Sequence, residues 1–261
     1  MELNRIYNMD CLEGMKRIPD KSVDMILCDL PYGTTACSWD EIIPFSEMWS
    51  QYNRVIKNNG LIVLTGDEPF TSKLINSNIL NFKYRITWNK MQGGGFLNAK
   101  KMVLKQTEDI CVFSNVKLGH STYNPQMRKK ETHKIRKIGK RNPVGETTYG
   151  KHNGQVSKGY DNTVSYPTNL ISISSKSGEC NSQTRFHPTQ KPVALFEYLI
   201  KTYTNEDETV LDNCMGSGTT AIACMNTKRN FIGFELDETY YNKSLERIKE
   251  HTTQTELFDY L

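Results

Sequence analysis

The hydrophobic positions of the chain follow two spacings. Short runs of mostly apolar residues bounded by turn residues are typical of strands buried in a parallel sheet. Between them lie stretches with apolar residues three or four positions apart, which predicts helices with one buried side. We expect Asn58-Asn59-Gly60 to end one of these helices. The predicted strands are residues 5–7, 25–28, 61–64, 84–88, 110–113, 209–212 and 230–235, and the predicted helices are residues 12–17, 41–58, 70–80, 193–203, 221–224 and 240–248.

The alternation of strands and helices predicts an α/β protein with a doubly wound sheet. The periodicity stops after Phe113, and order returns at His187. The stretch between them is rich in Lys, Arg, Ser, Thr, Asn, Gly and Tyr, and it is too long for a connecting loop. We therefore expect an inserted module or a partly disordered segment at residues 114–186, between an ordered part at residues 1–113 and another at residues 187–261.

Charge is distributed unevenly along the 261 residues. The net charge is +4, but residues 117–158 alone contain 11 Lys and Arg against two acids, Glu131 and Glu146. The rest of the chain carries 22 basic and 27 acidic residues. A basic segment on a neutral-to-acidic body predicts local contact with a polyanion.

Cysteine content and apolar run length exclude several classes of protein. The seven cysteines are odd in number and never spaced C-x-x-C, so we expect neither a disulfide framework nor a zinc or other metal site. No stretch approaches the roughly 18 apolar residues of a membrane span, and Met1-Glu2-Leu3-Asn4 does not open a signal peptide. These features predict a cytoplasmic protein with no membrane partner.

Candidate chemistry begins where the predicted strand at 25–28 runs into Asp29-Leu30-Pro31-Tyr32-Gly33. In open α/β sheets, ligands bind just past the carboxyl ends of the strands. Pro31 fixes its own φ and favours an extended Leu30, which holds the backbone carbonyls rigidly. An acid, an oriented carbonyl and an aromatic ring suit a planar ligand that carries an amino group. The alternative is an ordinary Asp/Pro/Gly turn.

A second constellation follows the predicted strand at 209–212. Asp212, the pair Gly216-x-Gly218, a helix, a strand and then Glu235 form a Rossmann-like βαβ half. Glu235 lies 23 positions after Asp212, close to the roughly 20 expected for an acid that binds ribose hydroxyls. The absence of a Gly-Lys-Ser/Thr sequence excludes a Walker site, and the missing third glycine argues against NAD. Ordinary packing glycines are the alternative.

Taken together, these motifs resemble those of the S-adenosylmethionine-dependent DNA methyltransferases that modify amino groups. Their order, with the catalytic tetrapeptide first and the cofactor glycines last, is the beta arrangement of that family. The resemblance covers roughly residues 3–113 and 186–250. Leu30 replaces the first proline of the commonest tetrapeptide, a position that contributes mainly a carbonyl. The motifs are Asp29-Leu30-Pro31-Tyr32, His187-Pro188-Thr189-Gln190-Lys191-Pro192, Asp212-Asn213-Cys214-Met215-Gly216-Ser217-Gly218-Thr219-Thr220 and Glu235.

The resemblance implies a Rossmann-like class I methyltransferase sheet and a catalytic role for Asp29, Leu30, Pro31 and Tyr32. Residues 1–113 would form the catalytic half, 114–186 an inserted basic target-recognition region, and 187–261 the cofactor-binding half. The target base would be flipped out of duplex DNA and stacked on Tyr32. The implied residues around S-adenosylmethionine are Asp10, Cys11, Asp29, Lys191, Asp212, Gly216, Ser217, Gly218, Thr219, Glu235 and Leu236.

Several of these assignments have alternatives. Asp10 could be a helix N-cap, and Lys191 could be a solvated surface charge. We interpret His187 as structural. We interpret Cys28 as a core residue, because the ring-carbon methyltransferases place their nucleophile in a Pro-Cys pair. The basic segment is expected to contact phosphates of double-stranded DNA, with a solvated loop as the alternative. Its expected DNA-binding residues are Arg128, Lys129, Lys130, Lys134, Arg136, Lys137, Lys140 and Arg141.

Asp29 also bears on the substrate. In the family that the chain resembles, adenine enzymes usually begin the tetrapeptide with Asp and cytosine enzymes with Ser, so we expect N-6 methylation of adenine by a site-specific, restriction-modification-type enzyme. The alternatives are the cytosine amine, protein glutamine or RNA, and a catalytically silent DNA-binding protein. Some beta-arrangement relatives are dimers, which makes a homodimer an expectation here.

Overall fold

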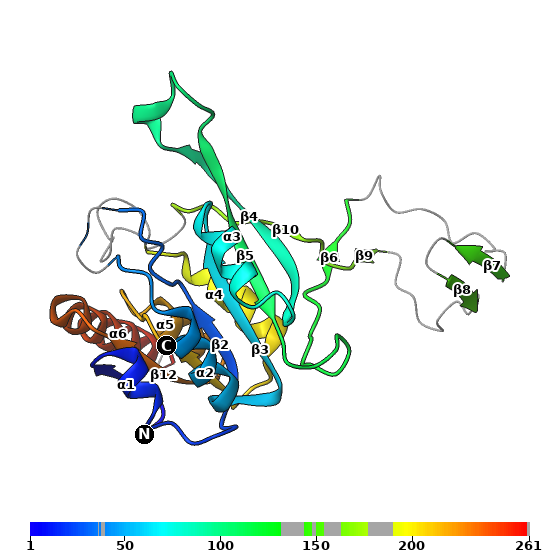
Figure 1. Cartoon of the computed structure of the whole chain (residues 1–261). Coiled ribbons are helices and arrows are strands. Elements are labelled where there is room, and N and C mark those ends of the chain that lie inside the picture. Colours follow the sequence, from blue (N-terminus) through cyan, green and yellow to red (C-terminus); the bar gives the residue numbers. More distant parts are fainter. Residues whose placement is uncertain are drawn as a thin grey trace. The chain divides into compact units, whose positions relative to one another are not determined.

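The computed structural model describes residues 1–35, 37, 40–131, 144–147, 150–153, 163–176 and 190–259 (Figure 1). The chain divides into two compact units. The first is Met1–Asn124 together with Asn169–Leu261, and the second is Pro125–Thr168. The second unit is shorter than the module expected at 114–186, because the residues flanking it on both sides belong to the first unit.

The first unit is built on one eight-stranded sheet in the order β1-β12-β11-β2-β3-β5-β4-β10. Neighbouring strands are parallel except at β5, which is antiparallel to both β3 and β4. The strands are β1 (Arg5–Asn8), β2 (Val23–Cys28), β3 (Ile56–Gly66), β4 (Phe82–Gly94), β5 (Lys105–Phe113), β10 (Leu170–Ser172), β11 (Thr209–Asp212) and β12 (Asn230–Glu235).

Strands β2 and β11 lie side by side in the middle of the sheet, with Met25 opposite Val210 and Ile26 opposite Leu211. Every residue of both strands is buried, as expected for strands covered on both faces. From this pair the strand order continues in one direction through β3 and in the other through β12 and β1. The strand order therefore reverses between β2 and β11, and such a switch point opens a crevice at the carboxyl ends of the strands.

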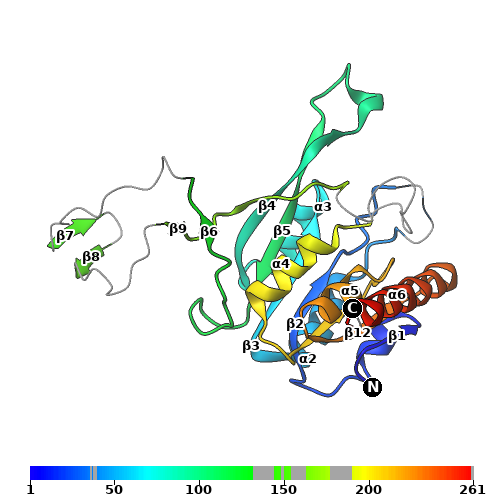
Figure 2. The same cartoon turned by 180° about the vertical axis from the view of Figure 1, so that it is seen from behind.

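Helices cover both faces of the sheet. One core cluster joins alternate strand residues such as Leu27 and Val63 to α4 and α5. The other joins their neighbours, Ile26 and Ile62, to α1, α2 and α3. Figure 1 shows α2 and α3 in front of the sheet, and Figure 2 shows α4 and α5 on the opposite side. The helices are α1 (Cys11–Met15), α2 (Phe45–Val55), α3 (Phe70–Ser77), α4 (Val193–Tyr203), α5 (Thr219–Asn226) and α6 (Glu238–Asp259).

These observations confirm the predicted α/β class with a mostly parallel sheet, but several predicted helix ends are wrong. The helix predicted at 70–80 ends at Ser77, the one predicted at 240–248 continues to Asp259, and the one predicted at 41–58 ends early. Helix α2 ends at Val55, and Asn58-Asn59-Gly60 lies inside β3. Ile56 is already extended and pairs with Val23. A Cβ at Gly60 would lie 2.6 Å from the Asp24 carbonyl oxygen, so this glycine permits close approach of two strands.

In the second unit, the described residues form two antiparallel pairs of short strands. β6 (Arg128–Lys129) pairs with β9 (Val164–Ser165), and β7 (Val144–Thr147) pairs with β8 (Gly150–Asn153). Arg128 and Lys129 are exposed on β6. Across both units, none of the helices in the described ranges is long and apolar enough to cross a membrane.

The packing of α1 on β12 gives a testable prediction. A Cβ at Gly14 would lie 2.3 Å from Cε1 of Phe234, a ring with no solvent exposure. Gly14→Ala should therefore lower the free energy of unfolding by about 1–3 kcal/mol, in spite of the better helix propensity of alanine. Urea denaturation measures this change. Gly94→Ala is the control, because its nearest neighbour would be 3.6 Å away, and equal effects of the two substitutions would contradict the packing argument.

Candidate active site

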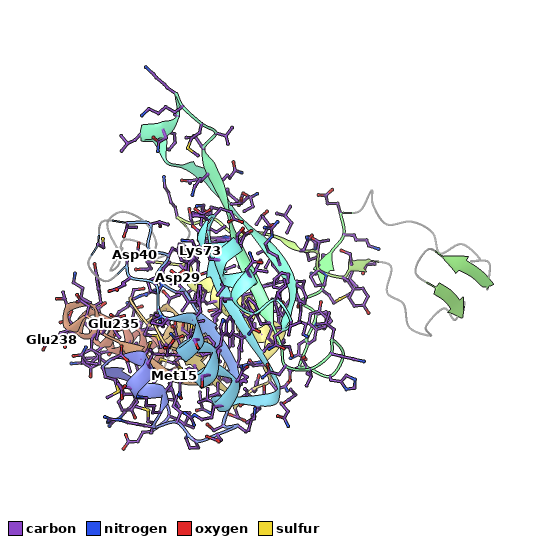
Figure 3. All side chains as sticks on the ribbon, in the orientation of Figure 1. Met15, Asp29, Asp40, Lys73, Glu235 and Glu238 are labelled. Carbon is purple, nitrogen blue, oxygen red and sulfur yellow. The ribbon has the colours of Figure 1, made fainter. Side chains whose placement is uncertain are left out.

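A cavity of about 1180 Å³ opens at the carboxyl ends of β2 and β11. Figure 3 labels Asp29, Asp40 and Glu235, which line it from three segments of the chain. The predicted residues that line this cavity are Asp10, Cys11, Asp29, Leu30, Pro31, Tyr32, Lys191, Asp212, Gly216, Ser217, Thr219, Glu235 and Leu236. Of the predicted set, Gly218 does not line the cavity; it is the N-cap of α5, with φ of 78°.

Three side chains hold the Asp29 carboxylate. Its Oδ1 accepts hydrogen bonds from the Thr65 hydroxyl and, at 2.8 Å, from the Tyr32 hydroxyl. Its Oδ2 accepts from Lys191 Nζ at 2.8 Å. An ionised carboxylate has about four acceptor positions, and the described residues use three of them, which leaves one on Oδ2.

Lys191 belongs to a chain of buried charges. Its Nζ lies 3.3 Å from Oε2 of Glu108, whose other oxygen accepts from Lys90 Nζ at 3.0 Å. Only 7% of Lys191 is exposed, so the alternative of a solvated surface charge is wrong. Burial would lower the pKa of Lys191, but the Asp29 and Glu108 carboxylates outweigh it and raise the pKa. Burial likewise opposes ionisation of Glu108, yet Lys191 and Lys90 hold its pKa below the usual value.

The Tyr32 ring is fixed by stacking as well as by its hydroxyl. It lies on the Phe70 ring with centroids 5.0 Å apart and planes inclined by 23°. Lys191 Nζ is 5.6 Å from the Tyr32 ring centroid. Burial, together with the nearby Asp29 charge, raises the pKa of Tyr32, which keeps the phenol a hydrogen-bond donor.

Asp40 organises the loop after the tetrapeptide. Its Oδ1 accepts from the backbone N–H of Gly33 at 2.9 Å, and its Oδ2 accepts from the N–H groups of Thr34 and Thr35 at 2.9 and 2.7 Å. Burial opposes this charge, but these bonds and the Thr35 side chain lower the pKa of Asp40. The carboxylate thus fixes the backbone directly after Tyr32.

The glycine loop is tied to both sides of the cavity. Oε2 of Glu235 accepts from the Gly216 N–H at 2.7 Å, and its Oε1 accepts from the Asp237 N–H at 2.9 Å. Burial raises the pKa of Glu235. Arg247 of α6 is buried and donates to the Ser217 carbonyl at 2.8 Å and to the Thr219 hydroxyl at 3.1 Å. The loop is therefore held in place by side chains rather than by its own backbone alone.

Asp10 has the N-cap role that was its alternative. Its Oδ1 accepts from the N–H groups of Leu12 and Glu13 at 2.9 and 3.0 Å, at the start of α1. Its side chain still lines the cavity beside Cys11. Cys28 is buried, and burial raises the pKa of its thiol to about 12, which agrees with the interpretation of Cys28 as a core residue.

Some predicted residues fall elsewhere. The motif residues His187, Pro188 and Thr189 lie outside the described residues, as do the basic residues Lys134, Arg136, Lys137, Lys140 and Arg141. Arg128, Lys129 and Lys130 belong to the second unit and do not line the cavity. Their role in DNA binding stays a prediction.

The geometry can now be set beside known proteins. A family model described as DNA methylase, of N6 and N4 amino-group methyltransferases, matches residues 23–246. The chain belongs to this N6/N4 DNA methylase family. The resemblance predicted from the motifs is confirmed, and the chain is a DNA methyltransferase.

Relatives of this methyltransferase match over nearly the whole chain. M1.MboII of Moraxella bovis, a type II methyltransferase, is 27% identical over 94% of this chain and 96% of its own. The DNA adenine methyltransferase YhdJ of Escherichia coli (strain K12) is 27% identical over 95% of this chain and 83% of its own.

Solved structures share the fold. The M1.HpyAVI–SAM complex is 25% identical, with a TM-score of 0.59 over 94% of this chain and 98% of that one. The cytosine-N4-specific PvuII DNA methyltransferase has a TM-score of 0.64 over 95% of this chain and 91% of that one. At 17% identity the PvuII likeness concerns the fold alone.

Four residues of the methyltransferase site were not identified from the sequence: Thr65, Glu108, Asp40 and Arg247. Thr65 follows directly after the predicted strand at 61–64, at the same edge as Asp29, so strand position could have found it. Arg247 carries no local signal, because its partners Ser217 and Thr219 lie on another segment, whereas Asp40 binds backbone N–H groups five to seven positions before it. Glu108 depends on the pairing of β4 with β5, where it lies opposite Trp88.

Asp212 gives a prediction about pH. Burial raises its pKa from 3.8 to about 6, while Thr220 and the Cys214 N–H donate to the carboxylate. Between these two pH values the folded protein keeps a proton that the unfolded chain has lost, so ionisation of Asp212 costs stability as pH rises through this window. One pKa unit corresponds to about 1.4 kcal/mol, so the loss is at most about 3 kcal/mol.

In Asp212→Asn this titration is removed. The stability of the variant relative to wild type should therefore rise by up to about 3 kcal/mol between pH 4 and pH 7. Urea denaturation of both cofactor-free proteins across this range measures the difference. A difference that does not change with pH would contradict the raised pKa.

Proposed function

We propose that this DNA methyltransferase transfers a methyl group from S-adenosylmethionine to the N-6 amine of adenine in duplex DNA. The observation that carries the proposal is the Asp29 carboxylate. Thr65, Tyr32 and Lys191 hold it in one orientation at the edge of the cavity, and one acceptor position is left for the hydrogen of an amine.

The cavity suits S-adenosylmethionine in size and charge. Its volume of about 1180 Å³ exceeds the roughly 300–1,000 Å³ of ordinary ligand pockets, which leaves room for a target base as well. Asp10, Asp29, Asp212 and Glu235 line it, which favours a cationic ligand. Gly216 also lines it, and a Cβ there would have one neighbour within 4 Å, at 3.9 Å, so a side chain would take up cavity space.

Among the relatives, M1.HpyAVI was solved in complex with SAM, which supports the same cofactor here. When bound, this cofactor supplies an electrophilic methyl group on a sulfonium. We assign Glu235 to its ribose hydroxyls and the glycine loop to its methionine part, in keeping with their places around the cavity.

The protein's own contribution is to position the amine and stabilise charge. The lone pair of an exocyclic amine is delocalised into its ring, which makes it a poor nucleophile. In the proposal, the Asp29 carboxylate and the Leu30 carbonyl accept its two hydrogens and localise the lone pair on nitrogen. When the amine takes up the methyl group, the carbon–sulfur bond of the sulfonium would break as the N–C bond forms. The nitrogen would then carry a positive charge that the Asp29 carboxylate stabilises until one amine hydrogen leaves as a proton to water.

The target base needs a flat support once it has left the helix. Tyr32 offers one, because its hydroxyl and its stacking on Phe70 hold the ring still. Unstacking a base costs a few kcal/mol, and stacking on an aromatic ring inside the protein offsets part of this cost.

The cytosine amine is the second candidate. It presents a similar amidine-like group, and a carboxylate can serve either ring. The likeness to the cytosine-N4-specific PvuII enzyme keeps this candidate open, whereas the adenine enzyme YhdJ is among the relatives at higher identity. Adenine is proposed because the tetrapeptide begins with Asp29.

We also propose that the second unit contacts the phosphates of the target duplex. Arg128 and Lys129 are exposed on β6, and Lys130 follows them. Lys and Arg contacts to phosphates position a protein on DNA without reading its sequence. A homodimer stays a prediction.

Mass spectrometry of nucleosides tests the proposed substrate. Mixed-sequence duplex DNA is incubated with enzyme and isotope-labelled S-adenosylmethionine, digested and analysed. We expect labelled N6-methyl-2′-deoxyadenosine. Labelled N4-methyl-2′-deoxycytidine without N6-methyl-2′-deoxyadenosine would assign the enzyme to the second candidate and leave the role of Asp29 intact.

Substitution of Asp29 tests the catalytic assignment. Asp29→Ala removes the carboxylate that orients the amine, so kcat should fall by about 10²-fold or more. Cofactor binding, measured by calorimetry, should change far less, because Glu235 and the glycine loop are intact. Glu235→Ala is the matched comparison and should raise the cofactor KM before it lowers kcat. Wild-type turnover by Asp29→Ala would remove this residue from catalysis.

A further inference from the structure

Beyond the cavity, strands β4 and β5 continue into a long hairpin that extends past the rest of the sheet (Figures 1 and 2). We name residues 91–104 the arm. Its tip is a single turn of 3-10 helix, Phe96–Asn98, preceded by Gly95 with φ of 82°. The N–H of Asn98 donates to the Gly95 carbonyl at 2.9 Å, and the N–H of Lys101 donates to the Asn98 carbonyl at 2.8 Å. The tip is thus a defined turn.

The arm exposes an unusual amount of apolar surface. Leu97 is 99% exposed, Val103 87% and Phe96 72%, and Met91 and Met102 are more than half exposed. Single exposed apolar residues are common, but five within a 13-residue stretch form a patch of the kind that marks an interaction site. Packing against the described residues does not account for them.

The charge on the arm has one sign. Lys100 and Lys101 are its only charged residues, and the sequence has no acid from Ile86 to Thr107. Where the arm joins the sheet, Lys90 forms an ion pair with Glu108, and Lys105 forms one with Asp67. In the described part of the chain, Lys100 and Lys101 form no ion pair. Two unpaired cations beside an apolar tip suit a polyanion that also offers flat apolar surfaces.

The arm is continuous with the active site. Gln92, Gly93, Gly94 and Phe96 line the same cavity as Asp29. At the root, Lys90 is the outer end of the charge chain that runs through Glu108 and Lys191 to the Asp29 carboxylate. A ligand that places a group against Asp29 therefore passes the arm.

We propose that the arm is a DNA-contacting element of its own, formed by the first unit, in which Lys100 and Lys101 bind backbone phosphates and Leu97 enters the base stack beside the flipped nucleotide. This inference rests on the proposed function. Apolar side chains that enter between base pairs are a known way to hold an unstacked duplex open. The position vacated by the target base lies next to the cavity that receives it, and the arm borders that cavity.

Other occupants of the patch fit the observations less well. If a second copy of the chain covered the patch, the exposure of the two adjacent cations Lys100 and Lys101 would be unexplained. A membrane surface would not explain why residues of the arm also line the cavity that contains Asp29. Both are outcomes of the test below.

Salt dependence of DNA binding tests the lysines. The affinity of the full-length protein for a fluorescent mixed-sequence duplex is measured from 50 to 300 mM salt. Each phosphate contact contributes about 0.9 to the slope of log affinity against log salt, so Lys100→Gln/Lys101→Gln should reduce the slope by about 1.8. Lys83→Gln/Lys117→Gln is the matched control, because these lysines flank the opposite end of the same two strands. An unchanged slope in the arm variant, or an equal change in the control, would overturn the phosphate contacts.

A fluorescent base analogue tests the apolar tip. The methylated position is first mapped on DNA treated with the wild-type enzyme, and a duplex is then made with 2-aminopurine at that position. Binding of the wild-type enzyme should raise the fluorescence of this base as it leaves the stack. Leu97→Ala should lower this rise, and lower kcat/KM for DNA by about tenfold, without changing cofactor affinity. Leu80→Ala is the control, since Leu80 is 90% exposed before the start of β4. Equal behaviour of the two variants would overturn the role of Leu97.

The two proposals fail in different ways. If wild type methylates DNA and the arm variants bind and methylate like wild type, the arm proposal is wrong and the function stands. If wild type methylates no DNA, the function fails, and the salt slopes still report whether the arm binds a duplex. Two results, each with normal salt slopes, would assign the patch to the other occupants. A dimer that sedimentation detects in wild type but not in Leu97→Ala would assign it to a second copy of the chain. Binding of wild type, but not of Leu97→Ala, to anionic vesicles would assign it to a membrane surface.

Discussion

The ion pair between the buried Lys191 and the partly buried Asp29 is the interaction on which the rest of the site depends. Moving charges out of water is costly unless each is paired and hydrogen-bonded. Here Lys191 balances two carboxylates, and Glu108 in turn shares its charge with Lys90. These four residues come from the end of β2, from β4, from β5 and from the segment before α4. The pairing therefore joins segments that are far apart in the chain at the edge of the cavity.

Sheet topology brings these groups together. Asp29 follows β2 and Asp212 ends β11, and the two strands are neighbours although about 180 positions separate them in the chain. The strand order reverses between them, which opens the crevice that both residues line. A chain that placed its cofactor motif before its catalytic motif could build the same edge, since the sheet requires only that the two strands be adjacent. The order of the motifs along the chain thus differs from the order of the strands in the sheet, and the strand order determines which residues meet in the site.

The sequence predicted what is local and periodic. The run at 25–28 is fully buried in β2, and the motif acids Asp29, Asp212 and Glu235 do line one cavity. What it could not predict depends on partners far along the chain. The end of α2 is set by the pairing of Ile56 with Val23, and the Ser217 carbonyl of the glycine loop accepts a hydrogen bond from Arg247, 30 positions further along the chain. A charged residue on a helix gives no sign that it is buried against a loop.

Lys191 illustrates how geometry refines a motif. The family resemblance places it among the residues around the cofactor, and its position in the cavity is compatible with that role. Yet its Nζ already pairs with the Asp29 and Glu108 carboxylates. Removing one partner of a buried ion pair typically lowers the free energy of unfolding by about 3–5 kcal/mol. A lysine that left Asp29 would also release the carboxylate that we propose orients the amine. The structure therefore favours Lys191 as the fixed counterion of Asp29, with any contact to the cofactor made without breaking that pair.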